Sequence, residues 1–354
     1  MFHEFAQASN DGHDRQEAGL SKRIFITGVA GFLGSHLADA MLALGHNVAG
    51  CDNLMGGYRE NVPKGVEFHE ADCCDFKRMN EIMKGVDAVY HCAAYPYEGL
   101  SVFSPVIVNL SIYQATSSVL AAFVNNQGKR FIFLSSMARY GMNQLPFTED
   151  MEPRPQDPYA LSKVASEQLI RMMARVFSYE YVIAVPHNII GPRQKYDDPF
   201  RNVAAIMINR MLQDKQPVIY GDGTQKRCFS FVQDCIDPLV KMLTLDHVVG
   251  EIFNIGPDDE FVSINELAAM IADILGFDLK PIYMPDRPQE VKEANCSADK
   301  ARRLLDYKPG YSLKKGLVEM IDWIKARGAK PFDYYLDVEI INDKTPQTWK
   351  KKLL

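Results

Sequence analysis

The chain has 354 residues, of which 47% are hydrophobic, and it carries a formal net charge of −6 at pH 7. This length is sufficient for two lobes around a large core, and the acidic balance argues against a nucleic-acid partner. The polar start is not typical of a signal peptide, and we expect no apolar run to span a bilayer, so we predict a cytoplasmic protein without membrane contact. The seven cysteines include no C-x-x-C pair, which indicates free thiols in a reducing compartment and no metal site.

The first predicted strand leads directly into a glycine-rich turn. Residues 23–27 form a short apolar run, three glycines follow at Gly28, Gly31 and Gly34, and residues 35–44 are typical of a helix. Strand, glycines and helix in this order form a dinucleotide-binding fingerprint. Gly28 allows a tight turn, Gly31 lets the backbone approach a pyrophosphate, and Gly34 allows the helix to pack closely on the strand. The helix N-terminus then offers N–H groups and a positive dipole end to the phosphates.

A second predicted strand, residues 47–51, ends at an acidic residue. Asp52 follows the glycines by about 20 residues, the spacing at which a carboxylate binds the ribose hydroxyls of NAD. The same charge repels the additional phosphate of NADP. The sequence therefore predicts NAD as the cofactor.

The remaining elements continue the alternation of strands and helices. Further strands are predicted at 66–69, 88–91, 130–134 and 181–185, and long helices at 105–125 and 157–177. This alternation is typical of an α/β protein with a Rossmann doubly wound parallel sheet. After residue 191, polar and glycine-rich loops interrupt the pattern, and we expect a smaller mixed α/β lobe there that binds the substrate.

The second long helix carries a tyrosine and a lysine on one face. Tyr159 and Lys163 are four residues apart, so their side chains lie one turn from each other. A phenol with a pKa near 10 is no base at neutral pH, but a neighbouring ammonium favours the phenolate. Ser136 precedes this helix and adds a hydroxyl. Beside a nicotinamide, these three side chains are suited to hydride transfer.

Taken together, these motifs resemble the extended short-chain dehydrogenase/reductases of the nucleotide-sugar epimerase/dehydratase family. The similarity runs from about residue 22 to about residue 327 and covers nearly the whole chain. Besides the glycine motif and the Tyr-x-x-x-Lys pair, the matching stretches are 91–94, 186–188, 191–194, 221–227, 287–290 and 298–301.

The resemblance implies a role for each site residue. Tyr159 removes the proton of a sugar hydroxyl, Ser136 hydrogen-bonds the same oxygen, and Lys163 binds the nicotinamide ribose and lowers the pKa of Tyr159. The cofactor-binding residues that it implies are Gly28, Gly31, Phe32, Leu33, Asp52, Asn53, Asp72, Cys73, Ala93, Ala94, Asn109, Tyr159, Lys163 and Pro186. The substrate-binding residues that it implies are Ser136, Asn188, Arg193, Arg227, Arg287 and Glu290.

Two of these arginines are candidates for the substrate diphosphate. The planar guanidinium groups of Arg227 and Arg287 can each bind phosphate oxygens through two hydrogen bonds. Each arginine could instead form a structural ion pair, Arg287 with Glu290 for example. One loop of the same lobe carries further positive charge at Arg193, Lys195 and Arg201. A sugar with a uronic acid group therefore remains possible as the substrate.

The residues after Ser136 separate the possible reactions. In the family, 4,6-dehydratases have Asp and Glu where this chain has Met137 and Ala138, and decarboxylases have Glu at the second position. GDP-mannose 3,5-epimerases have Cys at Ala138 and Lys near Asn202. The most economical interpretation is an NAD-dependent 4-epimerase for a UDP-hexose or UDP-hexuronate, which oxidises C4, rotates the ketone and reduces it again. A 4-dehydrogenase or 4-ketoreductase and a GDP-hexose epimerase of the 3,5 type remain alternatives. The next residue, Arg139, is unusual beside the serine and has no assigned role.

The sequence also predicts how the chain is organised. The predicted parts are a flexible N-terminal arm (1–20), an NAD-binding Rossmann domain (21–191 and 229–256), a nucleotide-sugar-binding lobe (192–228 and 257–331) and a C-terminal extension (332–354). The aromatic residues of the extension indicate that it packs on its own subunit or a neighbour, rather than in the active site. By resemblance, the helices at 105–125 and 158–177 pair in the four-helix bundle of a homodimer.

Overall fold

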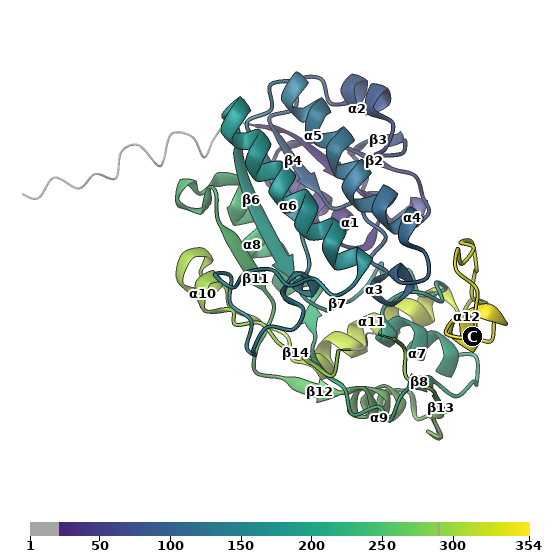
Figure 1. The fold of residues 1–354 in the computed structure, drawn as a ribbon. Helices are drawn as coiled ribbons and strands as arrows, with labels where there is room; N and C mark the ends of the chain where they lie inside the picture. The colour runs from purple at the N-terminus through teal and green to yellow at the C-terminus, as the bar shows by residue number, and fades with distance from the viewer. Residues whose placement is uncertain (1–20, 289–290) are drawn as a thin grey trace, which may run out of the picture.

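The computed structural model describes residues 21–288 and 291–354 (Figure 1), so the predicted arm at 1–20 and Glu290 lie outside the described residues. Seven described strands form a parallel sheet in the order β11-β6-β5-β4-β1-β2-β3. These strands are β1 (Arg23–Thr27), β2 (Asn47–Asp52), β3 (Glu67–Glu70), β4 (Ala88–His91), β5 (Arg130–Leu134), β6 (Glu180–Pro186) and β11 (Ile252–Ile255). The predicted Rossmann fold is confirmed.

Helices cover both faces of this sheet (Figure 1). One face carries α1 (Phe32–Ala43) and α8 (Val232–Thr244), and the other carries α2 (Phe76–Ile82), α5 (Ala115–Asn125) and α6 (Pro158–Phe177). Leu37 and Leu239 are fully buried in the core of the first face, and Met79 and Ile170 in the core of the second. Each helix therefore buries one apolar stripe against the sheet.

The start of α6 is fixed immediately before the tyrosine of the predicted site. The Asp157 carboxylate accepts a hydrogen bond from the backbone N–H of Ala160 at 2.8 Å, and Pro158 occupies the first helical position. An acidic N-cap followed by proline is a strong helix start, because both satisfy the geometry of the first turn. Tyr159 thus stands at a defined position on the helix.

The predicted helix at 105–125 is present, but with a π-helical turn at its centre. It consists of α4 (Pro105–Asn109), the π turn Leu110–Gln114 and α5. By length and composition this helix is apolar enough to cross a membrane, which corrects our expectation that no such run exists. Half of its apolar window is buried inside the molecule, as is usual for a core helix of a globular domain.

The second lobe is mixed α/β, as predicted. Its strands are β8 (Val218–Tyr220) with β13 (Ile282–Met284), and β9 (Lys226–Cys228) between β12 (Phe261–Ser263) and β14 (Glu293–Ala294). Its helices are α7 (Val203–Met211), α9 (Ile264–Leu275) and α11 (Leu313–Arg327). The shorter described elements are α3 (Glu98–Ser101), β7 (Ile189–Ile190), β10 (Ser230–Phe231), α10 (Asp299–Leu305) and α12 (Gln347–Lys350).

Helix α10 departs from the predicted division into domains. The sequence predicts it in the second lobe with the rest of 257–331, but it packs beside α8 and β11 on the Rossmann domain (Figure 1). Ala301, Leu305 and Tyr307 are buried there in the same core cluster as Leu239. The apolar face of this short helix therefore belongs to the first lobe.

The C-terminal extension, residues 332–354, packs against its own chain. It lies beside α7 and β8 in Figure 1. Leu336 and Trp349 are buried in a cluster with Tyr97, Phe103 and Phe200. The extension thus joins residues of both lobes.

Candidate active site

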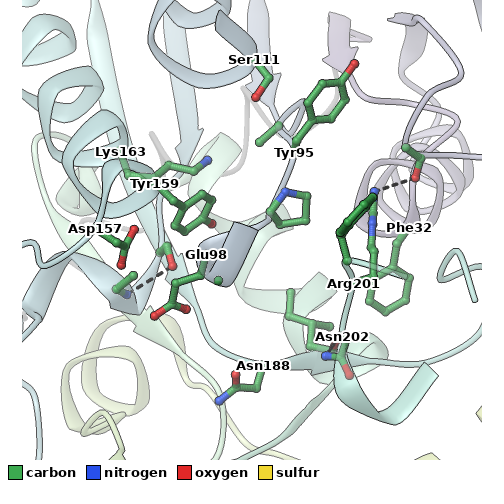
Figure 2. A pocket seen from close by; sticks show the side chains of 18 of the residues that line it. Phe32, Tyr95, Glu98, Ser111, Asp157, Tyr159, Lys163, Asn188, Arg201 and Asn202 are labelled. Carbon is green, nitrogen blue, oxygen red and sulfur yellow. Dashed lines mark hydrogen bonds between the residues drawn. The ribbon is translucent and has the colours of Figure 1, made fainter. Parts of the chain in front are cut away.

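A cavity of about 750 Å³ lies between the two lobes. It opens at the carboxyl ends of the parallel strands, where the strand order reverses between β1 and β4. Ligands of doubly wound sheets bind at such a reversal, because the loops there diverge to opposite faces. Figure 2 shows side chains from both lobes at this cavity, among them Tyr159 of the first lobe and Asn202 of the second.

The glycine-rich turn forms one wall of the cavity, and its backbone excludes larger residues. Gly28 has a φ of +70°, a conformation that favours glycine. A Cβ atom on Gly31 would lie 2.9 Å from the carbonyl oxygen of Gly28, and one on Gly34 would lie 2.3 Å from it. The turn therefore brings bare backbone and the N-terminus of α1 to the cavity, which fits the pyrophosphate of a dinucleotide.

Asp52 stands at the end of β2, next to this turn. Its carboxylate accepts hydrogen bonds from the backbone N–H groups of Ala30 at 3.0 Å and Leu54 at 2.8 Å. Burial raises the pKa of Asp52, and these N–H donors counteract the rise. The Asp52 carboxylate is held by the glycine turn itself. The groups suited to contact the phosphates and the ribose therefore form one rigid unit.

Most of the predicted cofactor residues line this cavity. They are Gly28, Gly31, Phe32, Leu33, Asp52, Asn53, Asp72, Cys73, Ala93, Ala94, Tyr159, Lys163 and Pro186. Asn109, exposed at the end of α4, is not among the residues that line the cavity, so its contact with the cofactor stays a prediction. The π turn that follows brings Ser111 to the cavity instead.

The predicted catalytic side chains all line the cavity, and Figure 2 shows Tyr159 and Lys163 beside each other. The Ser136 hydroxyl accepts a hydrogen bond from the backbone N–H of Ala138 at 3.2 Å and so caps the short 3₁₀ turn after it. Tyr159 and Lys163 are both buried. The Lys163 ammonium donates to the carbonyl oxygen of Leu134 at 2.7 Å and lies 6.0 Å from the centre of the Tyr159 ring.

Burial shifts the pKa values of both titratable groups of this cluster. Burial raises the pKa of Tyr159 above its usual range; the Ser136 hydroxyl lowers it, whereas the charges of Glu98 and Asp157 raise it further. Burial also lowers the pKa of Lys163 to about 8. Lys163 is not among the main groups that shift the pKa of Tyr159 in the protein alone, so the lowering that the resemblance implies stays a prediction for the NAD-bound protein. Further positive charge, such as that of an oxidised nicotinamide, would favour the phenolate.

Arg139, which had no assigned role, forms a buried ion pair behind the catalytic serine. Its Nε and Nη2 atoms each lie 3.0 Å from a carboxylate oxygen of Glu167, and both side chains are 3% exposed. The Ser135 hydroxyl donates to the same carboxylate. Glu167 follows Lys163 by one helical turn on α6, so this pair ties the serine loop to the catalytic helix.

The second lobe places two of its predicted arginines on the opposite wall. Arg227 and Arg287 line the cavity, and so does Asn188, near the end of the Rossmann segment 21–191. Arg227 donates to the carbonyl oxygen of Val291 at 2.6 Å, and the Arg287 guanidinium lies over the Tyr220 ring at 4.7 Å from its centre. Stacking on the Tyr220 ring orients the guanidinium of Arg287 at the cavity wall.

The basic loop after residue 191 is neutralised within the protein. Each of its three cations lies near a carboxylate: Arg193 near Asp39 at 2.6 Å, Lys195 near Asp197 at 3.4 Å and Arg201 near Asp198 at 3.3 Å. Arg193 also does not line the cavity. Its assignment to the substrate is therefore wrong, because the acidic residue on α1 draws its guanidinium away.

Our sequence analysis missed several residues of the site. Glu98 on α3 lines the cavity (Figure 2), and no local motif marks it. Trp349 and Leu354 of the extension also line the cavity, which corrects the expectation that this segment stays outside the active site. The aromatic residues of the extension are the only sequence signal for this contact. They predict that the extension is buried, but not which part of the fold it packs against.

The glycine turn, the buried carboxylate and the Ser-Tyr-Lys cluster define an enzyme that transfers hydride with a bound dinucleotide. The model of the NAD dependent epimerase/dehydratase family matches residues 24–256. The chain belongs to this family.

Several relatives agree with this assignment. The chain is 30% identical to a UDP-glucose 4-epimerase of Mycolicibacterium smegmatis, with 86% of this chain and 98% of the relative covered. It is similar to the crystal structure of a UDP-glucose 4-epimerase of Thermotoga maritima with UDP-glucose (TM-score 0.81, 30% identity, 86% of this chain and 99% of that chain). It is also similar to a UDP-glucuronic acid 4-epimerase of Bacillus cereus in complex with UDP-glucuronic acid and NAD (TM-score 0.80, 30% identity, 86% and 99% coverage). Nearly all of each relative is matched, whereas part of this chain has no counterpart in them.

Proposed function

We propose that the protein is a self-contained UDP-sugar 4-epimerase that retains its NAD through each turnover. The observation that carries the proposal is the cluster of Ser136 with the buried Tyr159 and Lys163, which lines the cavity together with the glycine turn and the two arginines of the second lobe. This arrangement places a base, a cofactor and a sugar within one enclosed cavity, which removes much of the entropic barrier to hydride transfer.

The residues of the chain have separate tasks in this reaction. NAD, when bound, accepts the hydride from C4 of the sugar and returns it. Tyr159 takes the proton of the C4 hydroxyl as the C4 ketone forms, and gives the proton back when the ketone is reduced on its other face. Ser136 hydrogen-bonds the same oxygen, and Lys163 holds the nicotinamide ribose.

The second lobe supplies the fixed point for rotation of the ketone. Arg227 and Arg287 bind the diphosphate, so the sugar swings while the nucleotide stays in place. Met137 and Ala138 beside the serine carry no proton that could be exchanged with C5 or C6. This favours inversion at C4 over elimination or 3,5-epimerisation.

The test is NMR of the purified protein in deuterated water with UDP- and GDP-sugars and no added cofactor. A C4 epimer without deuterium in the sugar ring is the expected product. A requirement for added cofactor would instead identify a 4-dehydrogenase or 4-ketoreductase. Deuterium at C3 or C5 of a GDP-sugar would identify an epimerase of the 3,5 type.

We further propose that the protein is a homodimer in which two helices of each subunit form a four-helix bundle. Large apolar side chains are exposed along the 105–125 helix and α6, at Val106, Leu110, Leu161, Met172, Val176 and Phe177. A two-fold contact would bury these side chains on both copies at once. Light scattering at micromolar concentration should give twice the chain mass, and the Leu161→Glu variant should give a monomer. A monomeric wild-type protein would contradict the proposal.

A cytoplasmic location completes the proposal. All seven cysteines are free, and the Sγ atoms of Cys51 and Cys73 are not bonded although they lie 3.7 Å apart. Reduced thiols are typical of proteins in the cytosol. Cell fractionation tests this directly, and recovery of the protein from a membrane or secreted fraction would contradict it.

A further inference from the structure

The C-terminal extension reaches the rim of the substrate cavity. Trp349 and Leu354 are among the residues that line it, although Trp349 is only 5% exposed. A Cβ atom on Gly99 would lie 3.8 Å from the Trp349 ring and 3.2 Å from Nη1 of Arg287. The indole and the guanidinium therefore pack against the same turn of backbone, at the start of α3.

A second contact connects the extension to the same arginine. The Thr348 hydroxyl is hydrogen-bonded to the Tyr220 hydroxyl, and the Tyr220 ring carries the Arg287 guanidinium at 4.7 Å. Arg287 thus packs against the Tyr220 ring and also lies close to the turn at Gly99, which Trp349 contacts as well. Side chains held from several sides lose little freedom when they bind, so they bind more tightly.

Other contacts hold the extension against both lobes. The Glu339 carboxylate accepts hydrogen bonds from the backbone N–H groups of Val106 at 2.9 Å and Ile107 at 2.8 Å, at the N-terminus of the 105–125 helix. The Tyr335 hydroxyl donates to Asp198 at 2.8 Å. The extension is therefore a built part of the structure, and its position over the cavity is defined.

We propose that Thr348 and Trp349 are positioning residues that hold Arg287 at the diphosphate subsite. The extension then determines how tightly the nucleotide diphosphate is bound, while the Ser136, Tyr159 and Lys163 cluster performs the chemistry. This inference rests on the proposed function for the identity of the ligand, a UDP-sugar.

The test compares UDP binding to the NAD-loaded wild-type protein and to the Trp349→Ala variant by calorimetry. We expect the variant to bind UDP about 10-fold more weakly, since one charge-assisted hydrogen bond contributes about this much. We expect KM for the UDP-sugar to rise by a similar factor, with kcat and NAD content nearly unchanged. Trp349→Phe should restore most of the affinity, and Thr348→Val should have a smaller effect. Equal UDP affinity in wild type and Trp349→Ala would overturn the proposal.

The chain provides a matched control and a reporter. It contains two tryptophans, and Trp323 on α11 does not line the cavity. Trp323→Phe should leave UDP binding unchanged, and in this background the fluorescence of Trp349 should change when UDP binds. Since UDP binding is measured without turnover, a protein that binds UDP but epimerises no sugar would contradict the proposed function and leave this inference standing.

Discussion

The cofactor wall and the substrate wall of the cavity are built in different ways. The cofactor wall comes mainly from one stretch of chain, in which the glycine turn exposes backbone and Asp52 is held by N–H groups of the same segment. The substrate wall is assembled from side chains of distant segments, such as Glu98, Arg287 and Trp349. A site made of backbone is marked by a local sequence pattern, whereas a site made of distant side chains is not.

The strongest test of this comparison removes the hydroxyl of Tyr159, the proposed base between the cofactor wall and the substrate wall. We expect Tyr159→Phe to lower kcat by about 10³-fold, the usual contribution of a general acid–base residue, while the fold and the bound NAD are retained. NMR turnover and the cofactor absorbance of the purified variant measure both quantities. Near-normal turnover would show that another group, such as Glu98, is the base.

Substitution of the buried Arg139–Glu167 ion pair tests whether the stability of the serine loop depends on its contact with α6. We expect Arg139→Met to lower the free energy of unfolding by about 3–5 kcal/mol, because it leaves the Glu167 carboxylate buried without a partner. Urea denaturation gives the value. The double variant Arg139→Met/Glu167→Met should recover most of the loss, since it removes both charges. A loss below about 1 kcal/mol in the single variant would mean that water replaces the arginine.

Substitution of Asp52 separates the two walls directly. We expect Asp52→Ala to weaken NAD binding by about 10- to 100-fold, the contribution of hydrogen bonds to a charged group, and to reduce discrimination against NADP. UDP binding should be unchanged. Calorimetry with both cofactors measures these effects, and Asp39→Ala, outside the cavity, is the control. Unchanged selection of NAD over NADP would refute the role of Asp52.

A smaller effect on the free energy of unfolding is expected when the pH is changed, through the titration of Lys163. The pKa of Lys163 is about 8 in the folded protein, below its usual value of 10.5. The unfolded chain therefore binds more protons between pH 8 and 10.5, and this group makes the protein more stable as the pH rises through that window. We expect the difference in unfolding free energy between wild type and Lys163→Met to change by about 1–3 kcal/mol across it. A difference independent of pH would mean that Lys163 titrates normally.

Sequence analysis predicted the fold and the backbone-based parts of the site. Strands β1, β4 and β5 have their predicted bounds, because short continuous apolar runs between turn signals are typical of buried parallel strands. Arg193 lies outside the cavity for a local physical reason, because an acidic neighbour on α1 pairs with its guanidinium. Glu98 and Trp349 could not be predicted, since their positions depend on packing between segments that are distant in sequence.

The extension also has a consequence for the order in which the protein matures. The hydrogen bonds of Tyr335 with Tyr97 and of Glu339 with Ile107 connect residues that are 238 and 232 positions apart. Contacts of such long range form late, because the chain between them must be made and folded first. During translation, the cofactor wall is complete long before residue 332 leaves the ribosome. A nascent chain can therefore acquire NAD before it can recognise a sugar nucleotide.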